Sequence, residues 1–384
     1  MMQEGNSENL EKARKLMDDF ARRTGLTGSG GDAAQRYLWT DAFAVQTCFG
    51  LAHALDEDSY RKLALRLIGA VHEHLGKYRQ DDIRKGWISG LPEAEGQQHP
   101  TAGGLRIGKR LPEREADEPS NEQLEWERDG QYFHYITRWI NALLQARQEA
   151  GQQRYADWAA ELIQAGGKFI DKSGGRMRMY WKMSIDLSRP LVPSMGAHDP
   201  MEGLICAESA REAAPDKASE LEPLISDFKK LCTGRDWSTT DTLGIGGLLL
   251  NTLRAAELAS AQGTLPEEIR PEKLLADSLY GLKVYARMHE ANRPARQRLA
   301  FRECGLSLGL RALSGMKEQV TALDLGELDR FIPLADAIED FWSNPANQQA
   351  PTWTEHLDIN AVSLAASMVA GHYPHAFCAI RNTQ

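Results

Sequence analysis

The sequence contains little that would place the protein in a membrane or in an oxidising compartment. Its five cysteines are odd in number, widely spaced and without a CxxC pair, which favours free thiols over a disulfide framework. No stretch approaches 18 uncharged apolar residues, so we expect no membrane-spanning helix. The charged N-terminal stretch also lacks the apolar core of a signal peptide. These absences predict a cytoplasmic protein with no membrane association.

The sequence also lacks an excess of positive charge. It has 45 Lys and Arg against 54 Asp and Glu, and no basic stripe, which argues against a nucleic-acid partner. Alternating runs rich in β-branched residues are scarce, so an extended sheet is not expected. With 384 residues and 42% hydrophobic residues, the chain has the composition of a globular protein. We expect an all-α protein forming a single domain over residues 1–384.

Two kinds of helical stretch alternate along the chain. One kind is amphipathic, as in residues 59–75 and 271–290, where leucines recur on one face and charges lie elsewhere. The other kind is apolar nearly all round and rich in Gly and Ala, as in "DTLGIGGLLLNTLRAAELA" and "DINAVSLAASMVAG". Because a helix that is apolar on every side must be buried on every side, the second kind is expected to be internal.

The alternation predicts a ring of helical hairpins. Internal helices are expected to start near six acidic residues: Asp41, Asp129, Asp199, Asp241, Glu303 and Asp358. Outer helices are expected near residues 8–23, 57–76, 152–170, 216–232, 271–290 and 327–343. Six internal helices covered by six outer helices form an (α/α)6 toroid. In such a ring the internal helices all start at one end, so their acidic residues should gather around one funnel.

An acidic residue at a helix start has two interpretations. Its carboxylate can accept hydrogen bonds from the unpaired backbone N–H groups and favour the positive end of the helix dipole. In a toroid the same residues also line a pocket, where carboxylates and aromatic rings suit sugar binding. Trp39 beside Asp41, and Trp353 near Asp358, have this pairing of ring and carboxylate.

The longest insertion runs over residues 77–123 and is locally basic around Arg106, Lys109 and Arg110. Long loops in compact domains are usually functional, so we expect residues 84–123 to fold over the funnel and bring Arg106 or Lys109 toward an anionic sugar. The segment around Trp181 is expected to form a short extended flap. His198 and Glu202 follow in "HDPME", which lacks the HExxH pattern, so no metal and no cofactor are expected.

The alternating helical pattern resembles the six-hairpin glycosidase superfamily, and "RYLWTDAFAV" and "LEWERDGQYFHY" resemble stretches of a bacterial group within it. The resemblance implies a carbohydrate-active enzyme whose substrate is a small molecule or an oligosaccharide, including anionic ones. Members include glycoside hydrolases and the N-acylglucosamine 2-epimerase group. A sugar epimerase would use paired histidines, here His198 and His356, and the PGHxxE element of that group corresponds to "GAHDPME" with one extra residue. A toroid that only binds a glycan or a protein is a third alternative.

For hydrolysis, one carboxyl group must protonate the leaving oxygen and a second must activate water or attack the sugar. Asp129 is the first candidate for the essential carboxylate, because Glu127, Gln131 and His134 lie close to it in sequence. Asp199 and Asp41, from other hairpins, are the candidates for the second carboxylate. The expected substrate-binding residues are Trp39, Glu127, His134, Arg106, Lys109, Trp181, Glu202, Asp241, Trp353 and Asp358.

Overall fold

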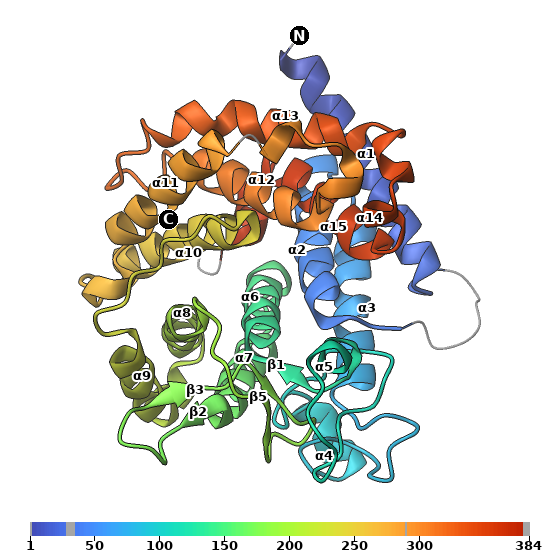
Figure 1. Cartoon of the computed structure of the whole chain (residues 1–384), viewed down its shortest axis with the longest axis vertical. Helices are drawn as coiled ribbons and strands as arrows, with labels where there is room; N and C mark the ends of the chain where they lie inside the picture. The colour runs from blue at the N-terminus through green and yellow to red at the C-terminus, as the bar shows by residue number, and fades with distance from the viewer. Residues whose placement is uncertain (1, 28–34, 289, 379–384) are drawn as a thin grey trace. The chain divides into compact units, whose positions relative to one another are not determined.

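The computed structural model describes residues 2–27, 35–288 and 290–378. Within them the chain forms 15 α-helices and five short strands (Figure 1). The residues divide into two compact units. The first unit comprises Met1–Asp32, Phe43–Ala64 and Gly234–Gln384, and the second comprises Ala33–Ala42 and Leu65–Thr233. The boundary passes through α2 (Leu38–Leu55) and α3 (Asp58–Leu75).

The first unit is built only from helices within its described residues. Besides parts of α2 and α3, they are α1 (Met2–Arg23), α10 (Thr242–Gln262), α11 (Pro271–Arg287), α12 (Ala300–Gly315), α13 (Ile332–Ser343), α14 (Pro351–Thr354) and α15 (Leu357–Ala370). Helix α12 packs between α10 and α15. A Cβ atom on Gly246 of α10 would lie 2.1 Å from the carbonyl oxygen of Gly305 of α12, so glycine is required where these two backbones touch. This contact accounts for the glycine-rich sequence of the internal helices.

The second unit combines helices with two small antiparallel sheets. Its helices, besides parts of α2 and α3, are α4 (Glu93–Gln98), α5 (Glu122–Glu127), α6 (Phe133–Ala150), α7 (Arg154–Gly166), α8 (Asp199–Ala213) and α9 (Ala218–Cys232). One sheet has the order β1-β4-β5 and the other pairs β2 with β3. The strands are β1 (Gln131–Tyr132), β2 (Ile170–Asp171), β3 (Arg178–Met179), β4 (Lys182–Met183) and β5 (Pro190–Val192). The expected extended flap around Trp181 therefore corresponds to β3 and β4.

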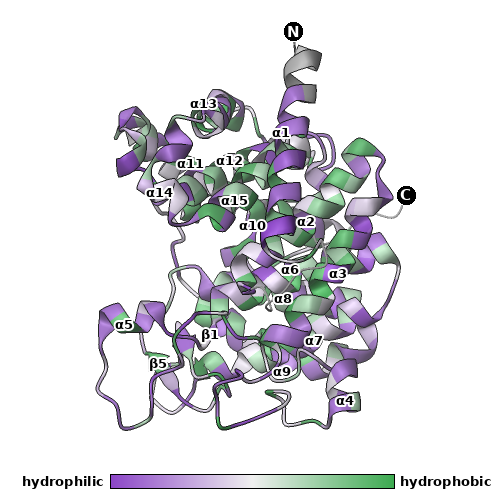
Figure 2. Ribbon diagram, turned by 90° about the vertical axis from the view of Figure 1, so that its right-hand side faces the viewer, coloured by the Kyte–Doolittle hydropathy of each residue, from purple (hydrophilic) through white to green (hydrophobic). Residues whose placement is uncertain are grey.

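All twelve predicted helices are present. The internal ones are α2, α6, α8, α10, α12 and α15, and every residue of α15 from Asn360 to Ala370 is buried, as an apolar helix requires. Figure 2 shows hydrophobic residues along α12 and α15, whereas the visible face of α1 is hydrophilic. One predicted boundary is wrong: α6 begins at Phe133 rather than near Asp129. Gly130 adopts φ 145°, and Gln131–Tyr132 pairs with β4 as a strand before the helix begins.

The long insertion at residues 77–123 belongs to the second unit and is fixed there by ion pairs. The Arg84 guanidinium binds Asp82 at 2.7 Å and Glu113 at 2.5 Å, and it reaches Asp186 before β5 at 3.3 Å. The backbone N–H of Ile185 donates a 2.7 Å hydrogen bond to Glu113. These ion pairs fix the insertion to the loop between β4 and β5.

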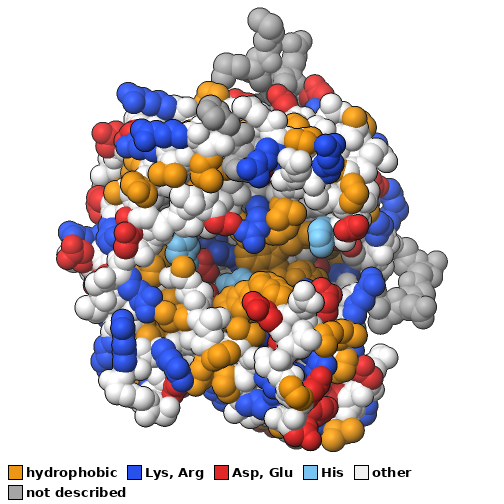
Figure 3. Space-filling view, in the orientation of Figure 1, with side chains coloured by type: hydrophobic (Ala, Val, Ile, Leu, Met, Phe, Trp, Pro, Cys, Tyr) orange, Lys and Arg blue, Asp and Glu red, His pale blue; other side chains and the backbone are white. Residues whose placement is uncertain are grey.

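The surface mixes charges of both signs. Lys and Arg side chains lie among Asp and Glu side chains over the face in view, without an extended area of one sign (Figure 3). In the described residues no helix is long and apolar enough to cross a membrane. All five cysteines are buried free thiols.

Candidate active site

Helix starts meet within each unit. In the second unit, Trp39 of α2 lies 5.4 Å from the ring of Tyr135 of α6, and Arg138 of α6 forms an ion pair with Glu202 of α8. In the first unit, the backbone N–H of Phe301, at the start of α12, donates to Asn360 of α15 at 3.0 Å. The starts of α2, α6 and α8 therefore gather in the second unit.

An aromatic cluster lies at this point of the second unit, formed by Tyr37, Trp39, Tyr132, His134, Tyr135 and Trp181. The His134 and Trp181 rings stack with centroids 5.6 Å apart and an angle of 7° between their planes. The hydroxyl groups of Tyr37 and Tyr135 are 2.5 Å apart and share a hydrogen bond. Burial raises the pKa of Tyr37 to about 12 and lowers that of His134 to about 4, so both are neutral at pH 7. Neutral rings and hydroxyls of this kind suit contacts to sugar faces and sugar hydroxyls.

Two carboxyl groups of α8 differ in their ionisation. Burial and the nearby Glu202 charge raise the pKa of Asp199 to about 7, although the backbone N–H of Gly196 donates to it at 3.1 Å. Burial also opposes ionisation of Glu202, but the Arg138 guanidinium and the 2.8 Å hydrogen bond from the Thr137 hydroxyl lower its pKa overall. Neighbouring carboxyl groups whose pKa values are pushed apart are typical of acid and base assignments in active sites.

Buried polar atoms beside this pair lack protein partners. Nε and Nη1 of Arg138 and Nδ1 of His134 form no hydrogen bond within the described part of the chain. The Arg138 guanidinium also lies over the Trp39 ring at 5.4 Å. Since buried polar groups in proteins nearly always have partners, these three nitrogens indicate room for a polar ligand or water.

Two further charged residues approach the aromatic cluster. The Lys109 Nζ lies 5.5 Å from the centre of the Tyr37 ring, and burial lowers its pKa, with Glu127 and Asp129 opposing that shift. Glu127 is exposed, and its charge acts on both Tyr37 and Lys109. Of the basic residues expected from the long insertion, Lys109 is the one that contacts the cluster.

Asp129, the first candidate for catalysis, is placed differently from the expectation. Its side chain is fully buried and accepts hydrogen bonds from the backbone N–H groups of Gly108 at 2.9 Å and Gly130 at 3.1 Å. It also forms an ion pair with Arg106 and lies 3.6 Å from a nitrogen of Arg79. With both oxygens occupied, Asp129 joins the long insertion to the start of α6 and has no free oxygen for a substrate. This geometry corrects the sequence interpretation.

Arg106 is corrected for the same reason. Its guanidinium is buried and donates to Asp129, to the Lys77 carbonyl at 2.8 Å and to the His74 carbonyl at 2.7 Å. Asp41 is also buried, where it accepts a 3.1 Å hydrogen bond from the Tyr37 backbone N–H and lies 3.7 Å from Arg36. Arg106 joins the insertion to the end of α3 and the start of α6, and Asp41 fixes the residues just before α2.

The candidates in the first unit lie at helix starts. Asp241 caps α10 by accepting from the Gly244 N–H at 2.8 Å and pairs with Arg302, and Asp358 pairs with Arg23 at 2.7 Å. Trp353 is buried and stacks on Trp342 with centroids 5.8 Å apart, so it packs the core and is not a sugar platform, which corrects that expectation.

The two histidines of the epimerase interpretation belong to different units. His198 precedes α8 in the second unit and is half-buried, whereas His356 precedes α15 in the first unit and is exposed. Their facing one another therefore stays a prediction. In the described residues no group of three or more His, Cys, Asp or Glu side chains is arranged to hold a metal ion.

Three important residues were absent from the sequence interpretation. Arg138 and Thr137 control the charge of Glu202, and an arginine inside the apolar stretch "YITRWINALL" was an available signal. Gly196 lies close to Asp199, since a Cβ atom on Gly196 would be 2.4 Å from the Asp199 carboxylate and would displace it. Nothing in the local sequence pattern indicates that contact.

The comparisons with known proteins concern the fold. No protein-family model matches the chain, and no curated protein matches it. Solved structures do match, among them two of alpha-1,6-mannanase GH76A of Salegentibacter sp. HEL1_6, in complex with alpha-1,6-mannotetrose and with alpha-1,6-mannotriose. Identity is 11% for both, the TM-scores are 0.57 and 0.58, and the matches cover 96% and 95% of this chain and 99% of the mannanase chain. The fold is an (α/α)6 toroid. The prediction of that fold from alternating helices is confirmed.

The solved mannanases are inactive variants in which two consecutive aspartates are replaced. Consecutive aspartates occur twice in this chain, at Asp18–Asp19 and Asp81–Asp82. The first pair lies in the outer helix α1 and the second in the long insertion.

Proposed function

We propose that the protein is a glycoside hydrolase acting on an oligosaccharide, with Asp199 as the general acid. The observation that carries this proposal is the Asp199–Glu202 pair, in which burial and the Glu202 charge raise the pKa of Asp199 to about 7. A carboxyl group that keeps its proton near pH 7 can donate it to a leaving glycosidic oxygen. The toroid fold shared with a mannanase and the aromatic cluster beside Asp199 support the same reaction class.

The second carboxylate in this proposal is Glu127. Glu202 is a poor choice, because it lies on the same helix as Asp199 and its charge is occupied by Arg138 and Thr137. Glu127 comes from α5, is exposed, and makes no ion pair among the described residues, so its oxygens are available for water or for the sugar. Cleavage of a glycosidic bond requires two carboxyl groups that flank the scissile bond, and two residues from different elements can approach the sugar from different sides.

The histidine of the aromatic cluster favours hydrolysis over epimerisation. Proton abstraction beside a carbonyl needs bases on two sides of the sugar, and the cluster supplies one histidine, His134, whose pKa burial lowers to about 4. A base with so low a pKa removes a carbon-bound proton poorly. An anionic sugar as substrate and a cytoplasmic location stay predictions.

The proposal is tested by incubating the wild-type protein with a panel of oligosaccharides and following the anomeric protons by NMR. We expect new reducing ends, and a loss of at least about 100-fold in rate for Asp199→Asn and for Glu127→Gln. Asp58→Asn, at the exposed start of the outer helix α3, is the matched control and should keep full activity. Full activity in a folded Asp199→Asn protein contradicts the proposal. A changed configuration at the sugar C2 without cleavage indicates epimerisation instead.

A further inference from the structure

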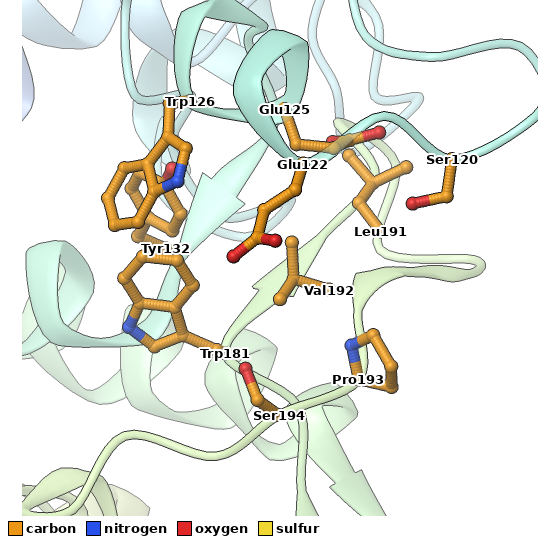
Figure 4. Close-up of a pocket in the computed structure, with 10 residues that line it drawn as sticks. All are labelled: Ser120, Glu122, Glu125, Trp126, Tyr132, Trp181, Leu191, Val192, Pro193 and Ser194. Atoms are coloured by element: carbon orange, nitrogen blue, oxygen red, sulfur yellow. The ribbon is translucent and has the colours of Figure 1, made fainter.

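A pocket of about 320 Å³ lies beside the aromatic cluster in the second unit. It is bounded by α5, the segment around Trp181 and strand β5, and its lining includes Ser120, Glu122, Trp126, Trp181, Val192 and Ser194 (Figure 4). Its volume is at the lower end of the range of small-molecule sites, roughly 300–1,000 Å³. The proposed catalytic residues Asp199 and Glu127 are not among the residues that line this pocket.

Two indole rings form one wall of the pocket. The Trp126 and Trp181 rings have centroids 4.9 Å apart and lie at 68° to each other, and Trp126 is 51% exposed. The half-exposed Trp126 indole offers a flat apolar face to a ligand in the pocket. Flat apolar faces bordered by polar groups match the apolar faces and hydroxyl rim of a pyranose ring.

A carboxylate from α5, the helix that also carries Trp126, enters the pocket. The Glu122 carboxylate points into the space between the two indoles and Val192 (Figure 4). Glu122 makes no ion pair in the described part of the chain. The other lining acid, Glu125, is neutralised by Arg114 at 2.5 Å and by the buried Lys182 at 3.3 Å. The unpaired Glu122 carboxylate therefore disfavours an anionic sugar group directly beside it and can accept hydrogen bonds from hydroxyl groups or a sugar amine.

Trp181 belongs both to the pocket and to the aromatic cluster. The Trp181 indole lines the pocket together with the Trp126 indole. The same Trp181 ring stacks on the His134 ring, with centroids 5.6 Å apart. His134 in turn lies in the electrostatic reach of Glu202 and Arg138. The pocket and the aromatic cluster therefore share the Trp181 ring.

We propose that the pocket is a second sugar subsite, which binds one unit of a neutral or amino-sugar oligosaccharide through Trp126 and Glu122. With this subsite, the ligand class of the protein is a neutral or amino-sugar oligosaccharide. A uronic-acid oligosaccharide and a monosaccharide fit the subsite less well. Its link to cleavage rests on the proposed function, but the binding itself does not.

The test measures binding to the full-length Asp199→Asn protein by isothermal titration calorimetry. The probes are alpha-1,6-mannotetraose, cellotetraose, chitotetraose and the acidic tetragalacturonate. We expect at least one neutral tetrasaccharide to bind and tetragalacturonate to bind much more weakly. Adding Trp126→Ala should weaken the binding of the neutral ligand about 30-fold, the usual effect of truncating a central tryptophan at an interface. Adding Glu122→Gln should reduce the difference in affinity between the neutral tetrasaccharide and tetragalacturonate.

Tyr280→Ala is the matched control, because Tyr280 is a 60% exposed aromatic residue of α11 in the other unit, and its removal should leave binding unchanged. Equal binding with and without Trp126 overturns the subsite but leaves the hydrolase proposal standing. Absence of binding by every neutral tetrasaccharide also overturns it. Binding that depends on Trp126, together with no cleavage by the wild-type protein, supports the subsite and contradicts the proposed hydrolysis.

Discussion

Asp129 precedes α6 and Asp199 begins α8, so the two residues occupy similar positions in the sequence pattern of internal helices. Both are buried in the same unit. Asp129 is surrounded by the cations Arg106 and Arg79 and by backbone N–H groups. Asp199 has one backbone donor and a neighbouring carboxylate, Glu202, which raises its pKa together with burial. The comparison teaches that partners from distant segments, and not the helix start itself, decide whether such an acid supports structure or chemistry.

The largest effect is expected on the structural side of this comparison. Asp129→Asn removes the counter-charge of the buried Arg106, and breaking one partner of a buried ion pair costs roughly 3–5 kcal/mol of unfolding free energy. Asp241→Asn is the matched change at a half-exposed helix start, where the ion pair with Arg302 is solvated and asparagine still caps the helix. It should cost less than about 1 kcal/mol. Denaturant unfolding at pH 7 measures both, and equal losses would break the comparison.

Asp199→Asn is expected to increase the unfolding free energy, whereas Asp129→Asn lowers it. Because the folded pKa of Asp199, about 7, lies above its value in the unfolded chain, about 3.9, the folded state binds an extra proton between these pH values. The contribution of Asp199 to the stability of the wild-type protein therefore falls as pH rises from about 4 to 7 and then stays level. The asparagine variant lacks this loss and should be more stable by roughly 2–4 kcal/mol at pH 8, with almost no gain near pH 4. A variant less stable than the wild type at pH 8 would show that the buried carboxylate is well compensated.

A smaller effect is expected from Glu202→Gln. The Glu202 charge raises the pKa of Asp199, so neutralising it should lower that pKa and move the alkaline limb of the pH–rate profile down by roughly half to one pH unit. The rate at pH 7 should fall a few-fold, while the rate at pH 5 changes little. Thr137→Val is the control, because it removes a hydrogen bond to Glu202 but leaves the charge in place. If the alkaline limb of the pH–rate profile does not move in Glu202→Gln, the Glu202 charge does not raise the pKa of Asp199.

Much of the fold was predictable because it depends on local pattern. The apolar, glycine-rich stretches predict internal helices, since burial on every side leaves no polar face, and the close contact of Gly246 with Gly305 shows why small residues occur there. The start of α6 was missed because Gly130 adopts a positive φ and the following two residues pair with β4, a segment about 50 residues away. Strand pairing over that separation leaves no local trace.

The site was less predictable because its electrostatics depend on partners far apart in sequence. Arg106 and Lys109 are three residues apart in one basic loop, yet Arg106 is buried against Asp129 and Lys109 lies over Tyr37. Trp353 and Trp181 both looked like sugar platforms, but Trp353 stacks on Trp342 in the core and Trp181 lines a pocket. Composition identifies the residue types of such a site, and packing decides which of them a substrate can reach.

The proposed reaction depends on Asp199 keeping its proton near neutral pH, so that it can donate this proton to the leaving oxygen. Side-chain carboxyl ¹³C NMR, recorded as a function of pH on protein labelled at aspartate, measures this without knowledge of the substrate. The Asp199→Asn spectrum assigns the resonance by its disappearance. The structure predicts a titration midpoint of about 7 for Asp199, which should move down in Glu202→Gln. A midpoint near 4 or below, the ordinary range for an aspartate, would contradict the account.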